Sequence, residues 1–201
     1  MRSGVAAPLQ AVLEHNRLDL LTLAALTARL LHLARNGPDA ISDPREALAL
    51  GYVYARGYRQ GQGLPNESND ATLEERARAS FRRAIDRCRS PRGAYDPIRI
   101  DALRALALAY RRARQHEQAA RMWSELLETR GCPPLLVREA TEALAIHHEH
   151  RDRDLGAAKA FALRNLENGL RPAWTRAARH RLARIERKMT TSGRCALLNL
   201  E

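Results

Sequence analysis

The chain repeats one arrangement of small and bulky residues at a fixed distance. Its apolar residues recur at the three- and four-residue spacing of amphipathic helices, and the pattern of one helix pair returns in the next, where His148 follows Tyr110 by 38 residues. The matching positions are Leu106, Ala107 and Tyr110 in one pair, and Leu144, Ala145 and His148 in the other. Because each such pair buries its apolar face only against its neighbours, the sequence predicts an array of stacked helix pairs.

The second helices of these pairs fit the same spacing, and an earlier pair fits the same template. Helical spacing predicts that the aromatic residues Trp123 and Phe161 pack in the core. The matched positions of the second helices are Ala119, Trp123 and Leu126, then Ala157, Phe161 and Arg164. The earlier pair contributes Gly51 and Tyr54 from its first helix, and Ala77, Phe81 and Ala84 from its second.

This pattern resembles the tetratricopeptide repeat, although no pair carries every residue of it. The resemblance covers residues 43–189 and implies helical hairpins arranged around a concave groove. The expected elements are a helix from Asp43-Pro44 to about Arg56, a loop over 57–69, a helix from Ala71 to Cys88, the two pairs above, and a capping helix from Pro172 to Met189. The tail at 190–201 is expected to fray.

Composition agrees with packed helices. Aromatic residues make up only 4% of the chain, while Ala, Leu and Arg dominate, which favours an all-α fold over strands. The cysteines Cys88, Cys132 and Cys195 are odd in number and show no Cys-x-x-Cys spacing, so neither a disulfide framework nor a zinc ribbon is predicted. We read no export signal and no membrane span, and we expect a cytoplasmic protein.

The net charge of +11 admits two interpretations. Cations that neutralise phosphates favour nucleic-acid binding, but Lys159 and Lys188 are the only lysines, and so strong a preference for arginine is also typical of a GC-rich genome. The best candidates for phosphate contacts lie on the last helix, opposite its apolar side, where an ordinary solvated face would look the same. They are Arg176, Arg179, Arg184, Arg187 and Lys188.

The longest predicted helix runs from Leu9 to about Arg35 and ends at Asn36-Gly37-Pro38. Its apolar arc is wider than a helix that opens a repeat array requires, so something outside the array should cover it. The helix also carries His15 and Asp19 one turn apart, on one face. Such a pair is most often solvated, and by itself it indicates no chemistry.

The surrounding residues add a resemblance. The run His15-Asn16-Arg17-Leu18-Asp19-Leu20-Leu21-Thr22-Leu23 closely resembles the last catalytic motif of YprB-like, DnaQ-related exonucleases with a ribonuclease-H-like fold. Helical repeats follow this helix in that family, so the likeness extends over nearly the whole chain. It implies that Asp19 is a ligand of catalytic Mg²⁺ or Mn²⁺ and that His15 is the general base that deprotonates the attacking water.

The remainder of such a site is missing from this sequence. The family binds two metal ions through four carboxylates, two of them in an Asp-x-Glu on the opening strand, and this chain contains neither an Asp-x-Glu nor a β-rich segment before Asp19. One carboxylate cannot hold two hard cations. We therefore read residues 1–36 as the final helix of a truncated nuclease domain, and expect the chain alone to hold no metal and to be inactive.

Three functions follow from these sequence features. The first is a C-terminal module that braces a ribonuclease-H-like exonuclease domain, in cis or in trans, or guides nucleic acid to it. The alternative is a free-standing adaptor that binds another protein in the repeat groove, and a third possibility is a nucleic-acid binder that acts through the Arg-rich last helix. A further candidate, a zinc site at His147, His148 and His150, competes with a structural role, because no matching Cys or Asp-rich partner accompanies these residues.

Overall fold

A computed structural model describes residues 7–60, 67–91, 93–167 and 172–198. All of the regular structure in these residues is helical, which confirms the all-α prediction. The elements are α1 (Ala7–Asn36), the short 3₁₀ helix η1 (Pro38–Ala40), α2 (Pro44–Gln60), α3 (Glu67–Arg87), α4 (Pro97–Arg112), α5 (His116–Glu128), α6 (Pro134–His147), the π-helical turn η2 (His148–Asp152), α7 (Leu155–Glu167) and α8 (Pro172–Leu198).

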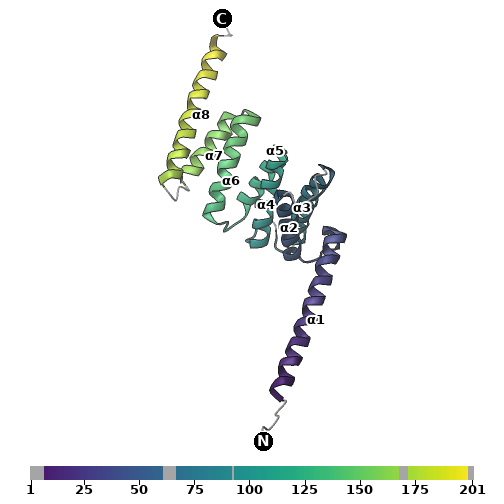
Figure 1. The fold of residues 1–201 in the computed structure, drawn as a ribbon. Coiled ribbons are helices and arrows are strands. Elements are labelled where there is room, and N and C mark those ends of the chain that lie inside the picture. Colours follow the sequence, from purple (N-terminus) through teal and green to yellow (C-terminus); the bar gives the residue numbers. More distant parts are fainter. Residues whose placement is uncertain (1–6, 61–66, 92, 168–171, 199–201) are drawn as a thin grey trace.

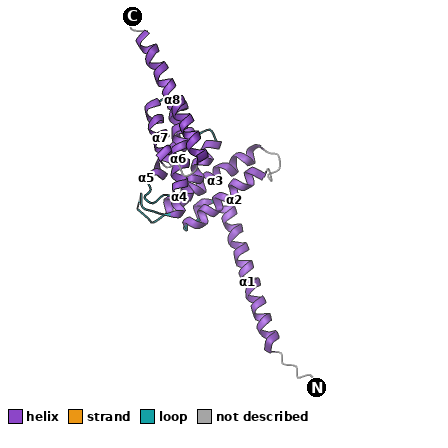
Figure 2. Cartoon of the chain, turned by 90° about the vertical axis from the view of Figure 1, so that its left-hand side faces the viewer, coloured by secondary structure: helices purple, strands orange, loops and turns teal. Residues whose placement is uncertain are grey.

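Consecutive helices from α2 to α8 pack against one another in chain order (Figure 1). Three buried clusters follow one another through the described residues, and they are centred on Phe81, Trp123 and Ile185. Helix α1 and the C-terminal part of α8 extend away from opposite ends of this array (Figure 2). Each helix pair therefore buries its apolar residues mainly against its sequence neighbours, as the repeated pattern predicts.

The small residue in the first helix of each pair permits close packing. Gly51 of α2 lies so near Phe81 of α3 that a Cβ on the glycine would fall 2.5 Å from the ring carbon Cε1. The matching residues Ala107 and Ala145 are fully buried in α4 and α6. The predicted close packing of a small residue against a bulky one is therefore observed for Gly51 and Phe81, and the other two small residues are buried as expected.

The second helix of the last pair departs from the predicted spacing. In α5 the buried residues are those that the pattern picks out. In α7 they are Ala158, Ala162 and Asn165, each one position after the predicted Ala157, Phe161 and Arg164. The π-helical turn η2 stands between α6 and α7, and a π turn takes up one residue more than an α turn. The constant 38-residue spacing is therefore wrong for α7, where Arg164 is exposed and Phe161 is half-buried, although Phe161 still packs against the second buried cluster as predicted.

Helices also extend beyond their predicted ends. Helix α2 continues to Gln60 and α3 begins at Glu67, so much of the loop predicted at 57–69 is helical, and residues 61–66 lie outside the described residues. Helix α8 continues to Leu198, so the tail predicted to fray is helical up to that residue. Apolar periodicity marks where a helix packs, and a helix can continue past its packed part.

Helix α1 projects away from the other helices (Figure 1). It is anchored at its C-terminal end, where Leu33 is 5% exposed in the first buried cluster and the Arg29 Nη2 donates to Glu46 Oε2 at 2.6 Å. Gly37 then ends the helix with a positive φ of 70°. Among the helices that the structure describes, none combines the length and the apolar character of a membrane span.

Candidate functional site

Helix α1 exposes a long apolar surface. Ten of its large apolar side chains are between 49% and 68% exposed, and they are Leu9, Val12, Leu13, Leu18, Leu20, Leu21, Leu23, Leu26, Leu30 and Leu31. Val12, Leu23, Leu26 and Leu30 share one stripe of the helix at the three-, four- and seven-residue spacing. Asp19 falls in the same stripe, seven residues after Val12 and seven before Leu26. A partner that covered this stripe would therefore cover Asp19 as well.

His15 and Asp19 form the pair that their spacing predicts. The His15 Nε2 lies 3.3 Å from the Asp19 Oδ2, and the two side chains are 75% and 64% exposed. The neighbouring Glu14 is occupied separately, because it accepts hydrogen bonds from Arg17 at 2.7 and 2.8 Å. Within the described residues, no group of three or more His, Cys, Asp or Glu side chains is placed to hold a metal ion.

The three histidines suspected of binding zinc contact two different carboxylates. His147 and His148 both approach Asp152, at 3.2 and 2.9 Å, whereas His150 lies 3.6 Å from Glu149. The His148 ring also stacks on Phe161, with ring centroids 5.4 Å apart and planes within 3°. These contacts favour the structural role, since the stacked His148 fills the aromatic position of its repeat.

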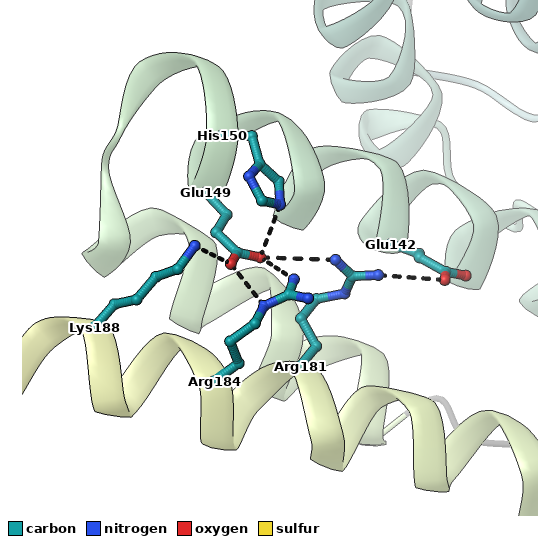
Figure 3. Close-up of polar contacts among 6 residues, drawn as sticks. All are labelled: Glu142, Glu149, His150, Arg181, Arg184 and Lys188. Carbon is teal, nitrogen blue, oxygen red and sulfur yellow. Dashed lines mark hydrogen bonds and ion pairs between the residues drawn. The ribbon is translucent and has the colours of Figure 1, made fainter.

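Three cations of α8, Arg181, Arg184 and Lys188, converge on one buried carboxylate, Glu149 of η2 (Figure 3). Arg184 donates to both of its oxygens, from Nε at 2.9 Å and from Nη2 at 2.6 Å, and Lys188 Nζ donates to Oε1 at 2.7 Å. Arg181 lies 3.7 Å from the same carboxylate and 3.8 Å from Glu142. The Glu149 side chain is 0% exposed, while those of Arg184 and Lys188 are 36% and 42% exposed.

These contacts keep Glu149 ionised. Burial alone would raise the pKa of its carboxyl group, but the hydrogen bonds from Arg184 and Lys188 outweigh burial and lower the pKa from 4.5 to about 2. The charge-assisted bonds also raise the pKa of Arg184. The result is a fixed ion-pair network that joins η2 to the last helix.

The Glu149 network predicts a loss of stability in acid. Because the pKa of Glu149 is lower in the folded chain, its stabilising contribution is complete above pH 4.5 and disappears as the pH falls through that value towards about 2. Chemical unfolding of the native chain and of Glu149→Gln at a series of pH values should show a difference that shrinks over this range. Glu186→Gln, which removes the exposed ion pair between Lys159 of α7 and Glu186 of α8, is the control. A difference independent of pH would contradict the assignment.

An open cleft of about 700 Å³ lies beside this network, between η2 and α8. Its polar lining consists mainly of cations, with Arg153 from the end of η2 and Arg184, Arg187 and Lys188 from α8. His150, Thr191 and Glu149 also line it, and the side chain of Glu149 is 0% exposed. The cleft therefore presents positive charge to solvent.

The predicted phosphate-contacting cations thus separate into two groups. Arg184 and Lys188 are bound to Glu149, and Arg187 lines the cleft beside them. Arg176 and Arg179 are exposed on α8 and form no ion pair with any residue that the structure describes. Sequence reasoning missed the role of Glu149, which lies 35 residues from Arg184 and leaves no local signal.

No family model matches this chain, and no curated protein or solved structure is detectably similar to it.

Proposed function

We propose that this chain is the tetratricopeptide-like C-terminal module of a cytoplasmic ribonuclease-H-like 3'-5' exonuclease. In this proposal α1 is the last helix of the nuclease domain and packs on the rest of that domain, in cis or in trans, while the helix pairs brace it or guide nucleic acid towards it. The single observation that carries the proposal is the uncovered apolar stripe of α1, with Asp19 inside it.

The exposed stripe favours the interpretation that α1 packs against another surface. Helix propensity alone gives little stability to a helix that projects into water, because most helical stability comes from packing an apolar face. Large exposed apolar surfaces are typical of interaction sites, and ten large apolar side chains of α1 are exposed. The array supports only the C-terminal end of α1, through Leu33 and Arg29, so the covering surface must come from elsewhere.

Asp19 restricts what that surface can be. A partner that buried the stripe would also desolvate this carboxylate, which costs several kcal/mol unless a cation compensates it. Bound Mg²⁺ or Mn²⁺ would supply that compensation, and the partner would bring the remaining carboxylate ligands. In such a site Asp19 would hold a metal ion that activates water, and His15, 3.3 Å from Asp19, would act as the general base.

The test begins with the DNA upstream of Met1, read in all frames for a strand-borne Asp-x-Glu. If the motif is present, its domain is joined to or co-expressed with this chain and assayed on a labelled single-stranded oligonucleotide with Mn²⁺. We expect turnover that Asp19→Asn lowers at least a hundredfold, as loss of a metal ligand should. Glu14→Gln, which breaks an exposed pair on the same helix, should leave turnover unchanged.

The isolated chain should show no metal-dependent turnover in the same assay. Robust hydrolysis by the isolated chain that disappears in Asp19→Asn would contradict an incomplete site. A reconstituted enzyme indifferent to Asp19→Asn would contradict the assignment of α1 to the nuclease domain. If no Asp-x-Glu precedes the chain in any frame, the adaptor becomes the better proposal.

One observation favours that adaptor. An apolar hollow of about 340 Å³ lies between α5 and α6, lined by Trp123, Ala143 and Ile146 and bordered by Arg111 and Arg151. A peptide side chain bound there would be held by apolar contact and oriented by the arginines. Ile146→Glu should abolish capture of a protein partner in nuclease-treated extract, whereas a partner that nuclease treatment releases would favour the first proposal.

A further inference from the structure

We propose that the cleft between η2 and α8 binds the phosphate groups of a single nucleic-acid strand. This deepens the proposed function, on which it rests, by locating the surface that guides nucleic acid. The cleft brings together four cations from two parts of the chain that are distant in sequence, and the one carboxylate among its described lining residues is buried.

Charge selects the ligand. Arg153 and Arg187 form no ion pair with any described residue, so their charges remain for a ligand. Glu149 offsets only part of the charge of Arg184 and Lys188, and its side chain is 0% exposed, so an entering anion meets the cations and not the carboxylate. Convergent charges in a cleft with low-dielectric walls produce a stronger field than charges spread over a convex surface.

The network also holds part of the cleft in place before a ligand arrives. Glu149 fixes Arg184 through two hydrogen bonds and Lys188 through one. Each cation keeps donors that these bonds do not use, because a guanidinium carries five N–H groups and an ammonium three. Side chains that are already ordered lose less entropy on binding. Glu149 is thus a positioning residue for the cleft.

The lining favours phosphates over bases. No Phe, Tyr or Trp is among the described residues that line the cleft, so the aromatic rings on which bases usually stack are limited there to the imidazole of His150. The outward residues Arg176 and Arg179 carry the same charge as Arg153 and Arg187 but lie outside the cleft. They provide a matched control on the same helix.

Fluorescence anisotropy of a labelled oligothymidylate with the full chain, over a series of salt concentrations, tests the proposal. Arg153→Gln/Arg187→Gln should weaken binding at least tenfold at low salt and reduce the slope of log K against log salt by about 0.7 for each lost contact. Arg176→Gln/Arg179→Gln should leave both quantities close to those of the native chain. Thermal unfolding of both variants checks that they are folded. We expect them to be, because all four side chains are exposed to solvent.

Each other outcome overturns the proposal. Equal losses of affinity in the two variants would mean that binding depends on the overall positive charge of the chain and not on the cleft. Absence of binding by the native chain would leave the cleft without the proposed ligand, and equal competition by oligoglutamate would show that the cleft does not select phosphates. The binding assay uses no nuclease domain. If the chain does not bind the oligothymidylate while turnover of the reconstituted enzyme still depends on Asp19, only the proposal for the cleft is overturned. A reconstituted enzyme indifferent to Asp19→Asn would overturn the proposed function and leave this binding result standing.

Discussion

Replacing both Arg184 and Lys188 with methionine should lower the free energy of unfolding by about 3 kcal/mol, because the change leaves a buried carboxylate without its main partners. Arg181 and His150 remain, but they lie 3.7 and 3.6 Å from Glu149 and compensate it less well. The pKa of Glu149 should rise well above about 2, since burial disfavours the ionised carboxylate and the hydrogen bonds from Arg184 and Lys188 no longer stabilise it. Urea unfolding and an acid titration of the variant measure the two effects.

A rescue variant separates a lost ion pair from lost packing. Adding Glu149→Leu to the two methionine substitutions removes the stranded charge, and apolar replacements of a whole buried network are often neutral or stabilising. The triple variant should therefore recover most of the lost stability. Arg104→Met, which breaks the more exposed pair with Glu139, should cost less than about 1 kcal/mol. A triple variant as unstable as the double one would show that Glu149 is not the cause.

Gly51→Ala should lower the free energy of unfolding by about 2 kcal/mol, the cost of overpacking less the gain in helix propensity. The added Cβ would fall 2.5 and 2.6 Å from two carbons of the Phe81 ring, which is 1% exposed and cannot move aside easily. Combining Gly51→Ala with Phe81→Leu, which removes the ring, should cost less than the sum of the two separate changes.

Gly57→Ala on the same helix is the matched control. A Cβ at Gly57 would meet only the Cδ1 of Leu73, at an ordinary 3.9 Å, so the substitution should raise the free energy of unfolding by about 0.5–1 kcal/mol. Urea unfolding of the two variants should give changes of opposite sign. Equal changes would show that backbone entropy, and not the contact with Phe81, governs both positions.

Local periodicity explains which elements could be predicted. The helix predicted from Leu9 to about Arg35 is observed from Ala7 to Asn36, and the pairing of Gly51 with Phe81 follows from the repeated pattern. The buried residues of α7 could not be predicted from a constant spacing, because the turn η2 shifts them by one position. The His15–Asp19 pair needed only helical spacing, and its role as a metal ligand and a base stays a prediction.

The sequence by itself determined the helical content, the order of the helix pairs and the apolar excess of α1, because each of these depends on the spacing of apolar residues that are close in sequence. Only the tertiary structure decided that Glu149 is buried beneath Arg184 and Lys188, and that Arg153 and Arg187 face one cleft. Glu149 and Lys188 lie 39 residues apart, on elements whose relative placement depends on the packing of α7 between them. Contacts of this kind depend on how whole helices stack, which no local pattern specifies.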